Sequence, residues 1–198
     1  MNKDVNWAPE VHKFNNKYYM FATFTLENNN RATFSLVGDT PEGEFILNSI
    51  EPLTPKDWCS LDSTVCYVEL NEDLSRPIGK PKYLFSASNA CGCKPDNSHH
   101  YVTDGPFLYR GKSDNLYMIW STLIENKYKQ CLCISDSKEI EGPWIQLENI
   151  FEDDGGHGMI FEDFNGELKL SLHTPNNQPL ERPKFYSIED TGKRINIK

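Results

Sequence analysis

Two aspartates and one histidine of this sequence have side chains that could move protons. Asp62 stands before Ser63, Asp104 stands before Gly105, and His157 lies within the glycine-rich run 155–158. Carboxyl and imidazole groups are common general acids and bases in enzymes. Each residue also has a structural explanation, because both aspartates can close turns and His157 can be held by hydrogen bonds in its turn. Proton transfer needs these groups close together, so the elements that position them decide between the two explanations.

Six cysteines are a second set of residues with potential chemistry. They stand at positions 59, 66, 91, 93, 131 and 133. The two Cys-x-Cys pairs could bind zinc, but paired zinc ligands are usually about two to four residues apart. We therefore favour free thiols, buried or half-buried, over a metal site.

Composition and charge exclude several classes of partner. The 198 residues include 20 Lys plus Arg and 29 Asp plus Glu, giving a formal net charge of −9. An acidic chain without a basic run argues against nucleic acid and against an anionic membrane as partner. No apolar stretch is long enough to span a bilayer. Residues 1–6 lack the apolar segment of a signal peptide, so we expect none in this chain and a cytoplasmic protein by default.

The hydrophobic pattern is typical of short β-strands. The runs 17–24, 116–122 and 168–173 are rich in aromatic and β-branched residues or alternate cleanly, and turn residues separate them. No segment keeps the spacing of an amphipathic helix over three turns. The sequence therefore predicts an all-β protein.

Two features repeat at the same interval along the chain. A strand–turn–strand plan recurs with turn anchors at Asn16, Asn115 and Gly166, which are 99 and 51 residues apart. A second motif, Pro41–Phe45, matches Ile140–Trp144, and its glycines are again 99 residues apart. A period of about 50 residues with several strands per unit is typical of β-propeller blades. We expect one domain, residues 1–198.

One unit of this repeat is defective. The period places a unit near residue 66, but Leu61–Thr64 runs directly into the strand-like segment 65–70 without a hairpin turn. The pattern predicts that a strand pair is missing there, and the blades then number about three and a half to four.

Four motifs resemble those of glycoside hydrolase family 43, the five-bladed β-propellers that cleave arabinose- and xylose-containing glycans. They follow one another in the family's order over nearly the whole chain: Trp7–Phe14, Leu61–Thr64, Tyr101–Arg110 and Gly155–Met159. The resemblance implies an incomplete five-bladed propeller that hydrolyses arabinofuranosyl or xylosyl linkages with inversion. Such a reaction uses one carboxylic acid and one carboxylate that activates water.

The resemblance also implies roles for the three proton-transfer candidates. Asp62 matches the aspartate that orients the acid and tunes its pKa. Asp104 stands where many members carry the general-acid glutamate, and its side chain is one methylene shorter. His157 matches a histidine of the central channel that often faces a Ca²⁺ ion or water, so the resemblance implies a Ca²⁺ beside it but no required cofactor. Because the three positions are 42 and 53 residues apart, near one blade period each, we expect them to face a common cavity.

Four more residues are candidates for contacts with a sugar. Trp7 resembles an aromatic sugar platform and could equally be blade core. Glu10, with His12, could line the site or support a strand end. Arg182 could bind substrate hydroxyls or form a surface ion pair. The pair His99–His100 is expected to be an exposed polar pair.

Two departures from the family pattern bear on activity. The family's general base lies in a blade before the Trp-Ala-Pro motif, and no residue of this chain matches it. A hairpin after the Leu-Asp-x-Thr motif, which carries a glutamate in close relatives, has no counterpart here. We therefore expect slow or undetectable hydrolysis by this chain alone. The alternatives are a sugar-binding propeller fragment without catalysis and a subunit completed by a partner, with self-association through open blade edges.

Overall fold

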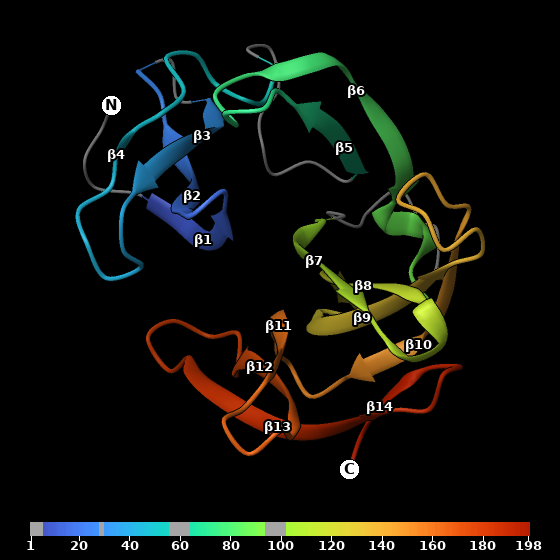
Figure 1. Cartoon of the computed structure of the whole chain (residues 1–198). Coiled ribbons are helices and arrows are strands. Elements are labelled where there is room, and N and C mark those ends of the chain that lie inside the picture. Colours follow the sequence, from blue (N-terminus) through green and yellow to red (C-terminus); the bar gives the residue numbers. More distant parts are fainter. Residues whose placement is uncertain (1–5, 28–29, 56–63, 94–101) are drawn as a thin grey trace. The chain divides into compact units, whose positions relative to one another are not determined.

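The computed structural model describes residues 6–27, 30–55, 64–93 and 102–198, without the side chains of residues 6–8. Nearly all regular structure in these ranges is antiparallel β-sheet (Figure 1). Three sheets have four strands each. The first contains β1 (Asn6–Phe14), β2 (Lys17–Thr25), β3 (Arg31–Gly38) and β4 (Ile46–Leu47). The second contains β7 (Asp104–Arg110), β8 (Leu116–Ile124), β9 (Lys127–Ser135) and β10 (Trp144–Phe151). The third contains β11 (Gly156–Glu162), β12 (Leu168–Thr174), β13 (Arg182–Asp190) and β14 (Ile195–Ile197).

A fourth sheet has only two strands within the described ranges. It pairs β5 (Thr64–Leu70) with β6 (Pro77–Ser86). This is the unit that the sequence predicted to be defective. In the part of the chain that the structure describes, the helical content is two short 3₁₀ turns, η1 (Ala87–Asn89) and η2 (Lys112–Asp114), and neither could cross a membrane.

The sequence repeats correspond to equivalent turns of the three four-stranded sheets. Asn16, Asn115 and Gly166 lie in the connections from the first to the second strand of each sheet. The second motif lies between the third and fourth strands, at 41–45 before β4 and at 140–144 before β10. The 99-residue interval therefore reflects one strand order used twice, which confirms the prediction of blade-like units.

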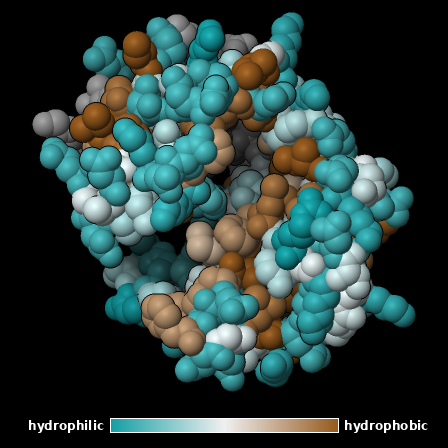
Figure 2. All heavy atoms as spheres, in the orientation of Figure 1, coloured by the Kyte–Doolittle hydropathy of each residue, from teal (hydrophilic) through white to brown (hydrophobic). Residues whose placement is uncertain are grey.

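The chain divides into two compact units. Residues 1–61 and 67–82 form the first, and residues 62–66 and 83–198 form the second. In the second unit, one hydrophobic cluster surrounds the buried Trp120, whose ring lies 5.2 Å from that of Phe85. Another cluster joins the sheets β7–β10 and β11–β14 through residues such as Ile119, Leu132 and Leu170. Hydrophilic residues cover much of the face seen in Figure 2, where some hydrophobic residues also reach the surface.

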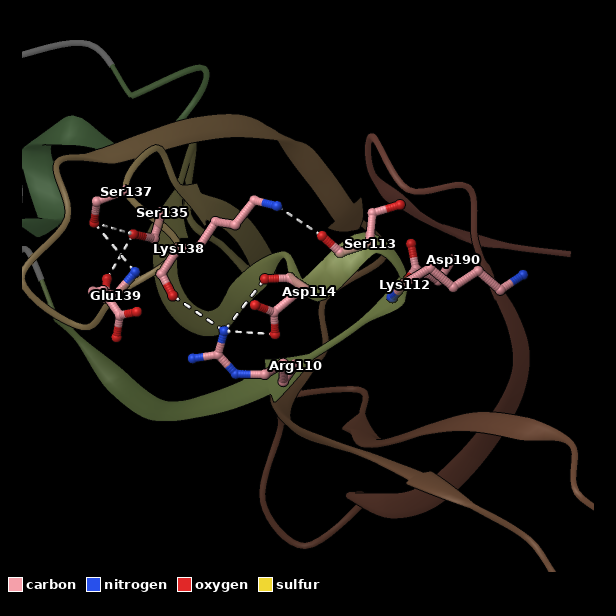
Figure 3. A network of polar contacts seen from close by, with 9 residues as sticks. All are labelled: Arg110, Lys112, Ser113, Asp114, Ser135, Ser137, Lys138, Glu139 and Asp190. Carbon is pink, nitrogen blue, oxygen red and sulfur yellow. Dashed lines mark hydrogen bonds and ion pairs between the residues drawn. The ribbon is translucent and has the colours of Figure 1, made fainter.

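Polar contacts tie the turns of the second unit together at the end of β7 (Figure 3). Arg110 donates hydrogen bonds to the Asp114 carboxylate at 3.1 Å and to the carbonyl oxygen of Lys138 at 3.2 Å. The Asp190 carboxylate, which is 4% exposed, accepts from the amide nitrogen atoms of Lys112 at 2.5 Å and Gly192 at 2.7 Å. The buried carboxylate therefore links the β7–β8 connection to the β13–β14 turn of the next sheet.

Candidate active site

Asp104 and His157 lie at matching bulges of two neighbouring sheets. Asp104 begins β7 and pairs with Ser121, and a bulge of one extra residue follows before Phe107. His157 lies within the corresponding bulge of β11, between Gly156 and Met159. Because β11 lies against β7 and β8 (Figure 1), the two bulges are adjacent. A bulge redirects side chains out of the regular alternation of a strand.

The Asp104 carboxylate has a hydrogen-bond donor or ionic partner at each oxygen. Tyr128 of β9 donates its hydroxyl to Oδ2 at 2.6 Å, and Nδ1 of His157 lies 3.2 Å from Oδ1. The side chains of Asp104 and His157 are each 33% exposed, so a solute can reach the pair. Two candidates that are 53 residues apart in the sequence are thus brought into contact.

The electrostatic surroundings keep Asp104 ionised. Burial raises the pKa of Asp104, but the hydrogen bond and charge of His157, together with the Tyr128 hydroxyl, outweigh burial and lower that pKa below its usual value. For Tyr128, burial and the negative charge of Asp104 raise the pKa, so its hydroxyl stays protonated and remains a donor. In the free protein the pair therefore presents a carboxylate rather than a carboxylic acid.

Buried polar side chains of the neighbouring sheet hold the backbone of the β11 bulge. The amide of His157 donates to Oγ of Ser121 at 2.8 Å, and the amide of Gly158 donates to Oε1 of Gln130 at 2.6 Å. Gln130 in turn donates to the carbonyl oxygen of Trp120 at 3.0 Å. Ser121 and Gln130 are fully buried, so the bulge is fixed by groups that have no access to water.

Gly105 allows the two bulges to approach each other. It has a φ of +49°, and a Cβ atom there would lie 2.8 Å from Cδ2 of His157. Only glycine therefore combines this backbone conformation with the His157 ring at this distance. The glycine of the Asp-Gly-Pro sequence at 104–106 is therefore needed for the close approach of the His157 ring as well as for the backbone conformation.

Tyr128, Ser121 and Gln130 were not predicted from the sequence as site residues. Ser121 lies in β8, and Tyr128 and Gln130 lie in β9, two strands whose residues are mostly buried. A polar Ser121–Thr122 pair and Gln130 inside such strands were the available signal, because a buried polar side chain needs a partner. Which partner each would meet depends on the packing of two sheets and is not encoded locally.

The other proposed site residues are distributed over the chain. Trp7 belongs to β1, where its backbone pairs with Thr23, and its side chain lies outside the described part. Glu10 faces His12 on the same strand, with Oε1 and Nε2 3.0 Å apart. Arg182 begins β13 and donates to the carbonyl oxygens of Pro179 and Glu181 at 3.0 and 2.7 Å. Through the pairing Thr174–Arg182, it lies at the end of the third sheet at which β11 begins.

Two sets of predicted residues fall outside the described ranges. Asp62 lies within 56–63, and the pair His99–His100 lies within 94–101. The structure brings Asp104 and His157 into contact. The expectation that these two residues and Asp62 face one cavity stays a prediction.

The described residues do not assemble a metal centre. The five cysteines within those ranges are free thiols: Cys66, Cys91, Cys93, Cys131 and Cys133. In the same ranges no group of three or more His, Cys, Asp or Glu side chains is placed to hold an ion. Ca²⁺ prefers about six to eight oxygen ligands, and Nδ1 of His157 faces Asp104. The described side chains thus do not fit a Ca²⁺ site by themselves, and no chemical step is derived through one.

Known proteins with a similar architecture were found among solved structures. No protein-family model and no curated protein matches the chain. Among solved structures, an endo-arabinase from Bacteroides thetaiotaomicron is 32% identical, with a TM-score of 0.81, over 93% of this chain and 75% of that chain. A thermostable family-43 glycoside hydrolase is 18% identical, with a TM-score of 0.76, over 98% of this chain and 74% of that chain. An endo-1,4-beta-xylanase from Bacteroides thetaiotaomicron is 20% identical, with a TM-score of 0.72, over 98% of this chain and 75% of that chain. The last two matches concern the fold alone.

The blade-like sheets and these matches define an all-β chain that corresponds to part of a five-bladed propeller of glycoside hydrolase type. The chain belongs to glycoside hydrolase family 43.

Proposed function

We propose that this chain acts on glycans with arabinofuranosyl or xylosyl groups and hydrolyses their glycosidic bonds with inversion. The observation that carries the proposal is the contact between Asp104 and His157 at matched bulges of two sheets, with both side chains open to solute. In a family of glycoside hydrolases, such a solute is a sugar.

Each candidate residue has a role in this proposal. Asp104 protonates the leaving oxygen, and Asp62 orients it and raises its pKa. An inverting reaction also needs a carboxylate about 6.5–9.5 Å from the acid that activates water on the other face of the sugar. The remaining candidates contact the sugar, and they are Trp7, Glu10, His157 and Arg182.

Asp104 must gain a proton before it can act as the acid. Its pKa is lowered in the free protein, although burial already acts in the opposite direction. A bound sugar would remove water from the exposed third of the side chain and strengthen the effect of burial. Substrate binding therefore favours the protonated form that the reaction needs.

The same electrostatics favour a second candidate function, sugar binding without cleavage. An ionised carboxylate held by two neighbours is a good acceptor for sugar hydroxyls but has no proton to give. No motif-matched residue supplies a general base, and loss of such a group costs about 10²- to 10⁴-fold in rate. We therefore expect the 198-residue chain to bind pentose oligosaccharides and to hydrolyse them slowly.

Hydrolysis and binding are to be measured on the same preparations. The substrates are nitrophenyl arabinofuranoside, nitrophenyl xyloside, arabino-oligosaccharides and xylo-oligosaccharides. Asp104→Asn should abolish the slow hydrolysis, whereas Asp114→Asn, an exposed aspartate on the β7–β8 connection, should not change it. Binding that needs Asp104 without any hydrolysis would select the second function. Fast turnover abolished by Asp104→Asn would mean that a base exists that the motifs do not identify.

A Ca²⁺ ion beside His157 stays a prediction. Calcium would raise the melting temperature of wild-type protein stripped with a chelator, and would have no such effect on His157→Gln. Equal responses of the two proteins would contradict it.

A further inference from the structure

We propose that Tyr128 is the positioning residue of the Asp104 carboxylate, held in place by a closed set of contacts with His173, Asn176 and Asp154. This inference rests on the proposed function, because it assigns Tyr128 a role in the reaction of Asp104. Nothing in the family resemblance points to these four residues.

The hydroxyl of Tyr128 fixes one oxygen of Asp104. Its distance of 2.6 Å to Oδ2 is that of a strong hydrogen bond between a hydroxyl group and a charged carboxylate. Since His157 occupies the other oxygen at 3.2 Å, rotation of the carboxylate would break two contacts at once. The tyrosine is only 4% exposed, so water does not compete for its hydroxyl.

The ring of Tyr128 is held by the third sheet. It stacks on the imidazole of His173 in β12, with centroids 5.5 Å apart and planes 19° from parallel. Nε2 of His173 lies 3.1 Å from Oδ1 of Asn176, which fixes the imidazole ring. The orientation of Tyr128 is therefore set from outside its own sheet.

The Asp154 carboxylate binds the backbone of both Tyr128 and Asn176, which completes the set of contacts. Its Oδ1 accepts from the amide of Tyr128 at 3.1 Å, and its Oδ2 accepts from the amide of Asn176 at 3.2 Å. The amide of Gly155 also donates to the carbonyl oxygen of Tyr128 at 2.8 Å. The backbone, ring and hydroxyl of Tyr128 are thus all held in place, and the hydroxyl in turn fixes the position of the Asp104 carboxylate.

Such an arrangement is expected to act on the chemical step rather than on substrate affinity. A displacement of about 1 Å in a reacting group can cost on the order of 100-fold in rate. The buried hydroxyl bonds to Asp104 and serves the substrate only through that carboxylate.

The test compares Tyr128→Phe with wild type and with the matched variant Tyr109→Phe, which alters a tyrosine stacked on Tyr117. In Tyr128→Phe the phenyl ring can still stack on His173, so we expect a melting temperature close to that of wild type. We expect kcat to fall about 10- to 100-fold with KM within about twofold, because only the position of the acid changes. Tyr109→Phe should leave both constants unchanged. The double variant with Asp104→Asn should be no slower than Asp104→Asn alone.

A readout that does not depend on turnover is the NMR signal of the Tyr128 hydroxyl proton. A buried hydroxyl bonded to a carboxylate should exchange slowly, so this proton should give a resolved signal that disappears in Tyr128→Phe and shifts in Asp104→Asn. Absence of the signal would overturn the contact itself.

The remaining outcomes separate the inference from the proposed function. Unchanged kcat in Tyr128→Phe, where Asp104→Asn is inactive, would overturn the positioning role alone. A rise in KM without loss of kcat would also overturn it and would assign Tyr128 to substrate binding. Equal hydrolysis, or none, in wild type and Asp104→Asn would overturn the proposed function, and the role of Tyr128 in the reaction with it.

Discussion

At the scale of single residues, the protonation state of Asp104 links structure and activity. Its pKa is lowered, so in the free protein the acid form is populated at a lower pH than for an ordinary aspartate. If Asp104 donates the proton, kcat/KM should rise as the pH falls through that lowered pKa. If Asp104 instead activated water, kcat/KM would fall over the same interval. A profile of kcat/KM between about pH 3 and 8 distinguishes the two roles.

The contact between Gly105 and His157 makes a second residue-scale prediction. Gly105→Ala would place a Cβ atom 2.8 Å from the His157 ring at a φ of +49°. Gly166→Ala is the matched control, because its φ is also positive, +78°, and its nearest neighbour would be 4.0 Å away. The backbone penalty is about 1–2 kcal/mol in both, and the clash should add about 1–3 kcal/mol in Gly105→Ala only. Chemical denaturation measures both values, and equal losses would refute the close contact.

The pair Glu10–His12 makes a prediction on pH. The hydrogen bond to Glu10 raises the pKa of His12, in spite of the opposing effect of burial. The stabilisation is therefore complete below the unfolded-state pKa of histidine and is lost as the pH rises through the raised value in the folded state. Because both side chains are about a third to a half exposed, it should be below about 1 kcal/mol. Glu10→Gln should lower the pKa of His12 in an NMR titration, and an unchanged pKa would contradict the pairing.

At the scale of elements, the turns could be predicted from sequence and the contacts between sheets could not. Asn16, Asn115 and Gly166 mark equivalent hairpins because tight turns demand particular residues within a few positions. Tyr128 gave no such signal, since its partner Asp104 lies on another strand, 24 residues away. Asp104 and His157 were found through motif resemblance, which carries information that local pattern lacks.

The carboxylate of Asp190 should be important for joining the second and third sheets. Asp190→Ala would leave the part-buried amides of Lys112 and Gly192 without their acceptor. Figure 3 shows Asp190 beside Lys112. Each such loss costs about 1–3 kcal/mol, so we expect destabilisation of about 2–4 kcal/mol. Asp114→Ala removes only the exposed pair with Arg110 and should cost less than about 1 kcal/mol. Urea denaturation of both variants provides the comparison, and similar small losses would argue against this role.

At the scale of the whole molecule, the structure leads to a prediction of whether the chain unfolds in one cooperative transition or in two. The sequence predicts one domain over residues 1–198, and the structure divides into two compact units. Strands β5 and β6 each contribute residues to both units. We therefore expect a single calorimetric transition whose enthalpy equals the van't Hoff value. Two separate transitions would show that the units unfold independently.

The outer edge of β13 is the place where self-association should occur. Within the described residues, β14 pairs only with Ile188–Asp190, so the preceding part of β13 lacks a strand on that side. Phe185 in this part is 66% exposed. Sedimentation should show association that rises with concentration and is weakened in Phe185→Lys, but not in Phe164→Lys, which changes an exposed turn residue. A monomer at all concentrations would contradict it.

The bulges at the starts of β1, β7 and β11 have a consequence for how such a scaffold can change over evolution. Each adds one residue, and the strand then resumes its pairing at Glu10, Phe107 and Met159. Beyond each bulge the register is set by the pairing of the strand itself, whereas Gly105 and Gly156 at the bulges have no room for a Cβ atom. The partly exposed side chains at Asp104 and His157 can therefore change by point substitution, whereas the glycines beside them cannot. The strand pairing can thus be conserved in evolution while the exposed side chains at the bulges change.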